Sequence, residues 1–442
     1  MTVATLRMRW LASLCVALLA LTAVLSGTAA HAADDPPRQV LVLLDMPAPH
    51  FRPDGNYSGG YADAAGRAAR RRTAAALARV HGLHLATDWP MPALGLDCYV
   101  MDVPAPLQPD EVATRLAREP RVAWAQAMHV FHPLGDGVGN RVGDRLAPCT
   151  HDDPLFTLQP AAREWHLAEL HAAATGQGVR VAVIDSAVQR DHPDLAEQID
   201  TSLNFAADAP AGSSGEMHGT AVAGIIAARA DNAIGIAGIA PRSRLLALRA
   251  CAQATPADAA LCTSLTLALA LHAAIDRDAR VINLSLAGPP DRLVQRLVET
   301  AQARGATVVA AADRAAPQGG FPAQLNGVVA ALDDKANAAA PNAFVAPGAD
   351  VPTTVPGSRW ASVSGASYAA AHVSGFVALM LEVHARSRRG TAAAAPAPVA
   401  ADLVRLADGR LDACASLARA ALACVCACGG AGPSPFEAMA RH

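Results

Sequence analysis

Apolar runs and helical segments follow one another in two different arrangements along this chain. In the first part, the pattern predicts strand, helix, strand, strand, helix and strand. These elements are expected at 39–45, 62–80, 83–87, 98–103, 109–118 and 121–129. Their order is that of a split βαβ unit, which we place at 37–131 as a small α+β domain.

From residue 155 the arrangement changes to strands and helices in alternation. The run 179–184 is almost continuously apolar and β-branched, as expected for a strand buried on both faces. Further strands are expected at 245–250, 281–286, 307–312, 328–332 and 344–346, and helices at 219–228, 264–276, 291–303 and 367–386. This alternation predicts a doubly wound parallel α/β domain at 155–413. The intervening residues 132–154, rich in Gly, Asp, Pro and Arg, are expected to form an exposed linker.

The N-terminus has the composition of a targeting segment. Arg7 and Arg9 precede an apolar run at 11–25, and Ala30-His31-Ala32 offers a small-residue cleavage site. We therefore predict a signal peptide at 1–32; the alternative, a membrane anchor, would need a longer run. The mature protein is expected to be secreted or periplasmic, with no stable membrane anchor. A net charge of −3 gives no indication of a nucleic-acid partner.

Eight cysteines remain once the signal peptide, with Cys15, is removed. An even number in an exported chain favours disulfides. Cys251 and Cys262 flank a short polar loop and are the preferred pair, while Cys98 with Cys149 is a weaker alternative. The tail at 414–442 contains a cluster of four cysteines that could instead bind a metal. Its Cys-x-Cys-x-Cys spacing is unusual for zinc, so disulfides are favoured there too.

Three residues able to perform nucleophilic catalysis stand at strand-to-helix junctions. Asp185 ends the run 179–184, His218 opens a helix, and Ser367 opens the last apolar helix. Taken singly, each has a plain structural interpretation as a cap or loop residue. In a parallel sheet, however, such junctions meet at one edge. There the serine could attack, the histidine move its proton, and the aspartate orient the imidazole.

The order Asp, His, Ser is that of subtilisin, and five motifs around these residues resemble the subtilisin (subtilase) family of serine peptidases. The similarity spans about 155–413. The motifs are Val-Ala-Val-Ile-Asp185 with His192-Pro193-Asp194-Leu195; His218-Gly219-Thr220 leading to Gly235-Ile236-Ala237-Gly238; Val281-Ile282-Asn283-Leu284-Ser285-Leu286; Phe344-Val345-Ala346-Pro347-Gly348; and Gly365-Ala366-Ser367.

This resemblance implies a subtilisin-like endopeptidase with Asp185, His218 and Ser367 as catalytic residues. Extended polypeptide substrates would pair as a strand beside Ser285, and no cofactor would be required. The first domain is similar to the family's ferredoxin-like propeptide. By that likeness it would act as an intramolecular inhibitor in a zymogen and be cut within 132–153. Residues from Cys414 onward would form a separate appendage.

The chain departs from the family at one position with chemical consequences. Subtilases usually have an Asn after the strand matched here by 307–312, as a second donor to the oxyanion. This chain has Asp313 and Arg314 there instead. The alternative function is therefore a subtilase-fold protein with weak or no activity that binds peptides. Asp194 and Asn232 match positions that ligate calcium in some subtilases, so a structural calcium ion is a further expectation, although Asn232 could equally cap a turn.

Overall fold

The computed structural model describes residues 37–46, 64–139, 150–206, 216–252, 260–334, 342–387, 399–423 and 425–426. Contacts separate residues 1–38 from residues 39–442, and the second unit holds every described helix and strand. The predicted signal peptide at 1–32 lies outside the described residues.

The first described elements form one antiparallel sheet with two helices. They are β1 (Gln39–Asp45), α2 (Ala64–His81), β2 (His84–Met91), β3 (Leu96–Asp102), α3 (Pro109–Leu116) and β4 (Val122–Ala127). The strand order is β2-β3-β1-β4, so the predicted βαββαβ arrangement is observed. Alternate side chains of β1 divide between two cores: Val40 and Val42 pack with α2 and α3, whereas Leu41 and Leu43 join a cluster that includes residues of helices further along the chain.

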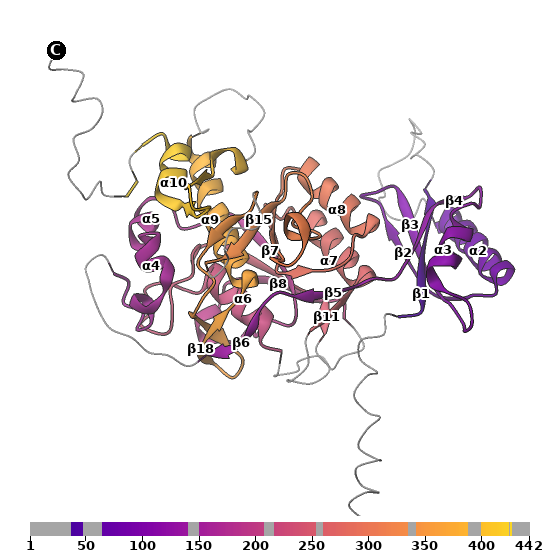
Figure 1. Cartoon of the computed structure of the whole chain (residues 1–442), viewed down its shortest axis with the longest axis horizontal. Helices are drawn as coiled ribbons and strands as arrows, with labels where there is room; N and C mark the ends of the chain where they lie inside the picture. Colours follow the sequence, from indigo (N-terminus) through magenta and orange to yellow (C-terminus); the bar gives the residue numbers. More distant parts are fainter. Residues whose placement is uncertain are drawn as a thin grey trace, which may run out of the picture. The chain divides into compact units, whose positions relative to one another are not determined.

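Further along the chain, seven strands form a parallel sheet, and the remaining helices pack around it (Figure 1). Its order is β16-β15-β14-β12-β7-β9-β8. The strands are β7 (Arg180–Asp185), β8 (Ile199–Asn204), β9 (Arg244–Arg249), β12 (Val281–Leu284), β14 (Thr307–Ala311), β15 (Val329–Asp333) and β16 (Phe344–Ala346). All pairs are parallel, as the alternation of strands and helices predicts. β8, in which Ile199 is buried and the other residues alternate between exposed and half-buried, was not predicted.

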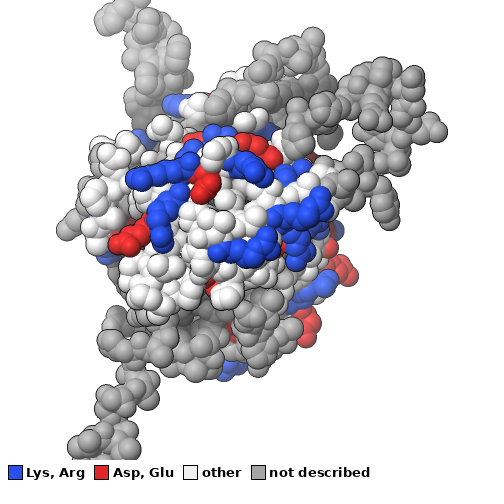
Figure 2. Space-filling view, turned by 90° about the vertical axis from the view of Figure 1, so that its right-hand side faces the viewer, with Lys and Arg blue, Asp and Glu red and all other residues white. Residues whose placement is uncertain are grey.

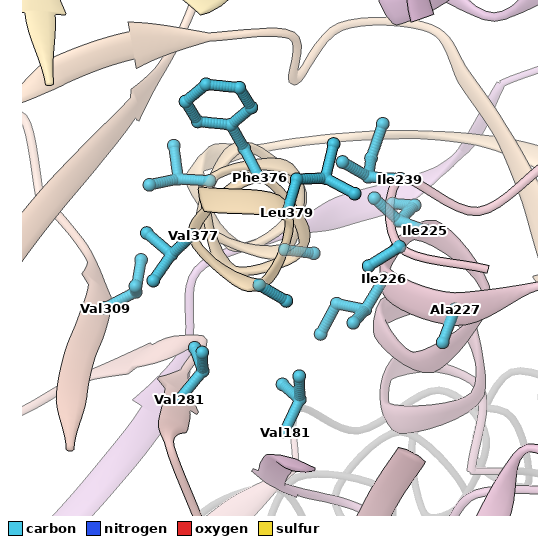
Figure 3. Packing of buried hydrophobic residues seen from close by; sticks show 14 of the residues in the cluster. Val181, Ile225, Ile226, Ala227, Ile239, Val281, Val309, Phe376, Val377 and Leu379 are labelled. Atoms are coloured by element: carbon cyan, nitrogen blue, oxygen red, sulfur yellow. The ribbon is translucent and has the colours of Figure 1, made fainter. Parts of the chain in front are cut away.

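Helices cover both faces of this sheet. α6 (His218–Ala227) and α9 (Ala366–Ser387) share a core with Val181 and Val183 of β7. α7 (Ser264–Asp276) and α8 (Arg292–Ala303) share the other core with Ala182 and Ile184. Figure 3 looks along α9 and shows Val377 turned toward Val309 of β14, with Leu379 on the side of α6. The α/β fold with two covered faces is thus confirmed.

α9 is the most deeply enclosed helix of this arrangement. Among the described residues, it alone is long and apolar enough to cross a membrane by length and composition. Most of it is buried within the fold, however, which is how the central helix of a folded domain also behaves. Its apolar length follows from its position between the sheet, α6 and α10 (Ala413–Ala421).

Two segments differ from the expectations for linker and tail. Residues 130–139 form β5 (Val130–Pro133) and β6 (Asp136–Gly139), both paired with other strands, a pairing that the expectation of an exposed linker from His132 did not include. Residues 140–149 lie outside the described residues. The tail begins not as an appendage but as α10, whose Leu417 is fully buried against the core of α9. A hydrophobic face on one side of α10 requires such a contact.

The described residues form two disulfides. Cys251 pairs with Cys262, as predicted, and joins β10 (Cys251–Ala252) to β11 (Leu261–Thr263). Cys414 pairs with Cys426, which takes these two residues out of the alternative metal site in the tail. Cys98 is a buried free thiol, while Cys149 lies outside the described residues.

Residues 67–72 of α2 include four arginines, and this stretch lies on a charged face. Figure 2 shows that face, with basic side chains spread over it and acidic ones between them. Arg67 and Arg71 both form ion pairs with Asp88, and Arg70 pairs with Asp97. These pairings account for three arginines of the run within the first domain itself.

Candidate active site

Asp185 and His218 lie at adjacent points on the carboxyl edge of the parallel sheet. Asp185 is the last residue of β7 and His218 the first of α6. The Nδ1–H of His218 donates to both carboxylate oxygens of Asp185, at 2.8 and 3.0 Å. Asp185 is 2% exposed and also accepts a hydrogen bond from the N–H of Ser186 at 2.7 Å. In a neutral His218 this pairing leaves Nε2 as the proton acceptor.

A buried ion pair holds the loop that leads into α6. Glu216 is bound by Arg249, the last residue of β9, and its Oε2 accepts a hydrogen bond from the N–H of Ala187 at 2.6 Å. Gly219 lets the two loops approach, because a Cβ there would lie 2.4 Å from the carbonyl oxygen of Ser186. The sequence did not reveal the role of Glu216, because its partner Arg249 is distant along the chain.

Ser367 stands in the first turn of α9, directly after a backbone turn at Gly365 with a φ of 141°. Its N–H donates to the carbonyl oxygen of Leu134 at 2.9 Å. Its hydroxyl donates to the carbonyl oxygen of Ser285 at 2.9 Å and accepts from the N–H of Leu134 at 3.0 Å. The N–H of Ser367, which has no partner within the helix because it lies in the first turn, is therefore hydrogen-bonded to a carbonyl from another part of the chain.

The hydroxyl of Ser367 is not hydrogen-bonded to His218. Within the described part of the chain, the Nε2 of His218 is buried and has no hydrogen-bond partner. Gly135 lies beside it, since a Cβ on that glycine would be 3.2 Å from Nε2. The structure thus brings together Asp185 and His218 and places Ser367 against the chain segment that passes them.

That segment runs past Ser367 as an extended strand. In β5, Pro133 pairs with Leu286 and His132 with Ala287 of the antiparallel β13 (Leu286–Ala287). The N–H of Leu134 also lies 3.3 Å from the carbonyl oxygen of Ser285. β6 then pairs with β18 (Arg359–Ser364), the strand that ends shortly before Ser367 in the sequence. An unbroken chain therefore lies across the serine in the way a peptide would lie.

Phe131 fixes the position of this strand through its side chain. It is fully buried, and its ring centroid lies 6.1 Å from that of Phe321. A Cβ on Gly288 would come within 2.4 Å of the Phe131 ring, so the absence of a side chain at Gly288 makes the space that the ring fills. Phe131 and Leu134 were not predicted as site residues, because the last strand of the first domain was expected to end at His129.

The two residues at the position of the usual Asn turn elsewhere. The carboxylate of Asp313 accepts a hydrogen bond from the N–H of Ala315 at 2.8 Å, and the Arg314 guanidinium forms an ion pair with Asp333. Among the described residues, the N–H of Ser367 is the one donor to the carbonyl of Leu134. Neither side chain therefore supplies a second donor in this arrangement.

The first domain is attached to the second at the start of α8. Asp291, which caps this helix and is 1% exposed, accepts hydrogen bonds from His129 Nδ1 at 3.0 Å, from Gln126 at 2.8 Å and from the Ser264 hydroxyl. The bond to Asp291 raises the pKa of His129 against the opposing effect of burial, and the charge of Asp110 adds to the rise. The bonds received by Asp291 in turn lower its pKa although it is buried.

Comparisons with known proteins agree with this geometry. Residues 176–408 match the family model described as the subtilase family. The chain is 34% identical over 250 residues to thermitase of Thermoactinomyces vulgaris, an alignment that covers 52% of this chain and 85% of thermitase. It is 35% identical over 232 residues to subtilisin Savinase of Lederbergia lenta, covering 49% of this chain and 83% of that protein.

A solved structure is similar in fold. Fervidolysin from Fervidobacterium pennivorans, described as a keratinolytic enzyme related to subtilisin, matches with a TM-score of 0.62 and 18% sequence identity. The match covers 90% of this chain and 63% of the fervidolysin chain. At this identity the likeness concerns the fold.

Proposed function

Because the chain belongs to the subtilase family and is a serine endopeptidase acting on polypeptides, we propose that it is a secreted zymogen that cleaves its own Leu134–Gly135 bond. Residues 37–134 would be the inhibitory propeptide, and the enzyme would begin at Gly135. The observation that carries this proposal is the contact of the Leu134 carbonyl with the N–H of Ser367 at 2.9 Å. The bond that follows this carbonyl is the one a serine peptidase would break.

The proposed reaction assigns one role to each residue of the triad. Ser367 turns from the Ser285 carbonyl toward His218, which takes its proton at Nε2 as the oxygen attacks the carbonyl carbon of Leu134. Asp185 holds the imidazole through Nδ1 and stabilises the imidazolium. His218 then gives the proton to the nitrogen of Gly135, the Leu134–Gly135 bond breaks, and water hydrolyses the acyl-enzyme. Ser285 contributes its carbonyl oxygen, which accepts the N–H of Leu134.

The rate should reflect a weak oxyanion site. Removing one oxyanion donor lowers kcat by about 100- to 1000-fold, a magnitude measured in a subtilisin. With the N–H of Ser367 as donor and Arg314 committed to Asp333, we expect a slow peptidase. Slow turnover suits a chain that must fold around its own segment before it cuts it.

Labelling and N-terminal analysis test the proposal together. The full chain and its Ser367→Ala variant are expressed, and each product is sequenced from its N-terminus and treated with a fluorophosphonate probe. We expect the wild type to yield a labelled fragment beginning at Gly135, and the variant to keep the Leu134–Gly135 bond and remain unlabelled. A wild type that is neither cut nor labelled would favour the peptide-binding alternative. A labelled fragment beginning elsewhere would refute the assigned bond.

The residues expected to hold calcium do not fit that ion here. One oxygen of Asp194 accepts a hydrogen bond from the Asn232 amide at 3.0 Å. Its other oxygen accepts the N–H of Ile236 at 3.0 Å and the Trp360 indole N–H at 2.7 Å. The Trp360 indole N–H occupies the carboxylate oxygen that a cation would need as a ligand. The side-chain oxygen of Asn232 is also engaged, because it accepts the N–H of Ile234. We therefore propose that hydrogen bonds, in place of calcium, close this loop.

Export is the remaining part of the proposal. Its support is the charged and apolar pattern of residues 1–32, together with two disulfides, which persist in oxidising compartments. Growth-medium fractionation of the native host tests it. Finding the fragment from Gly135 only inside the cytoplasm would contradict export.

A further inference from the structure

A second cluster of ionisable side chains lies apart from the triad residues, where residues 151–153 meet the loop after α6. His151 Nδ1 lies 2.9 Å from Asp231 Oδ1, and His151 Nε2 lies 2.8 Å from His171 Nδ1. The Nε2 of His171, a residue of α5 (Leu167–Ala173), lies 3.0 Å from the carbonyl oxygen of Ile239. Two imidazoles therefore stand in line between a carboxylate and a carbonyl.

For all three contacts to be satisfied at once, this line of groups needs one positive charge more than two neutral imidazoles and a carboxylate supply. Each of the three contacts needs one hydrogen, and the carboxylate and the carbonyl at the two ends can only accept. Two neutral imidazoles bring two hydrogens, one each. A third hydrogen would make one ring cationic; otherwise a cation must take the place of a hydrogen in one contact.

The contact that faces negative charge is the one at His151 Nδ1. Besides Asp231, the buried carboxylate of Asp153 is close, and ligand atoms of these three residues all lie within 4.8 Å of one another. Asp153 is fixed in place because it accepts the N–H of Asp231 at 3.0 Å. Two carboxylates and one imidazole nitrogen are thus gathered in one small region.

We propose that His151 Nδ1, Asp153 and Asp231 bind a divalent transition-metal ion of the zinc type. With the metal on Nδ1, both rings are neutral: His151 Nε2–H donates to His171 Nδ1, and His171 Nε2–H donates to the Ile239 carbonyl. His171 is then a positioning residue, since ligating imidazoles usually donate their other N–H to a fixed acceptor. One imidazole with two carboxylates suits zinc better than calcium, which prefers oxygen ligands alone.

The surroundings leave room to complete the coordination. His151, His171 and Asp231 line a cavity of about 570 Å³, which can admit water as a fourth ligand. Arg229 and Arg242 line the same cavity, and their charges oppose a cation, so affinity must come from the three ligands. None of these ligands belongs to the Asp194–Asn232 pair considered for calcium. The ion would tie residues 151–153 to the loop at 231.

The test uses the full chain with Ser367→Ala, which keeps it from cutting itself, after removal of bound metal. Zinc chloride is titrated by calorimetry in two buffers of different ionisation enthalpy, with calcium and magnesium chlorides in parallel. We expect saturable binding of about one zinc ion with release of about one proton, and a rise in Tm. Calcium and magnesium should not reproduce it.

Variants assign the ligands. His151→Gln and Asp231→Asn should each abolish the zinc-dependent rise in Tm, whereas His272→Gln, at a histidine that pairs with Asp276 instead, should retain it. Asp231 is exposed, so its variant should fold even if that of His151 does not. Cobalt(II) in place of zinc should give a spectrum without a thiolate charge-transfer band, which separates this site from cysteine ligands.

Two results would overturn the proposal. The first is zinc binding that both variants leave unchanged. The second is the absence of zinc binding combined with a stabilisation at low pH that His151→Gln removes. The latter would assign the extra charge to a proton.

Discussion

The fit between Phe131 and Gly288 makes a quantitative prediction about substrate preference. If residues 131–134 lie as a substrate does, the peptide Phe-His-Pro-Leu-p-nitroanilide should be cleaved much faster than Ala-His-Pro-Leu-p-nitroanilide. Phe131 is fully buried, and burying such a side chain contributes about 2–3 kcal/mol. If this free energy stabilises the transition state, kcat/KM for the phenylalanine peptide should exceed that for the alanine peptide by about 30- to 160-fold.

Gly288→Ala supplies the matched perturbation. The new Cβ would lie 2.4 Å from the Phe131 ring, a distance that the ring cannot accept without moving. The preference for phenylalanine over alanine should therefore fall by at least about tenfold, mainly through loss of kcat/KM for the phenylalanine peptide. The assay is release of p-nitroaniline by the processed enzyme. Equal turnover of both peptides by the wild type, or an unchanged ratio in Gly288→Ala, would refute the assignment of this pocket.

Three further predictions concern the loops and the interface. Asp291 raises the pKa of His129, so the contribution of His129 to holding the propeptide is complete below a pH of about 6.5 and is lost as the pH rises through the raised pKa. Activity should therefore appear faster at pH 8 than at pH 6, and His129→Gln should flatten this dependence. An unchanged pH profile in the variant would contradict the prediction. Glu216→Gln should remove the carboxylate that faces the buried Arg249 charge and cost about 3–5 kcal/mol of stability, seen as a lower Tm in the Ser367→Ala background. A Tm within error of the parent would count against this role. Arg314→Ala should change kcat only slightly, since the guanidinium pairs with Asp333, and a loss of about 100-fold or more would instead identify Arg314 as an oxyanion donor.

Periodicity and junction chemistry were enough to predict most of the fold. The parallel strands are buried on both faces and so appear as nearly continuous apolar runs, which is why β7, β12, β14 and β15 were found within a residue or two. β8 was missed because one of its six residues is buried, two are half-buried and three are exposed, so that it lacks a continuous apolar run. Asp185 and His218 could be placed together because Asp185 ends a parallel strand and His218 opens a helix that follows another strand, and such junctions lie at the same edge of the sheet.

The remainder of the site depends on contacts that no local pattern encodes. Residues 130–139 contain Pro133 and several glycines, and such composition is typical of a loop. They are extended because β13 and β18 supply partners from more than a hundred residues away. Likewise, the hydrogen-bond line from Asp231 to His171 joins three separate stretches of chain, and the engagement of Asp194 by Trp360 joins residues 166 positions apart.

If Leu134–Gly135 is the first bond that the enzyme cuts, the unbroken passage of the chain from β5 to β6 across Ser367 also determines the kinetic order of that reaction. Nucleophile and target belong to one molecule and are already in contact, so no encounter between molecules is needed. Maturation should follow first-order kinetics, with a half-time that is the same at nanomolar and at micromolar protein concentration. Dilution would slow only the later steps, in which one mature molecule degrades the propeptide released by another.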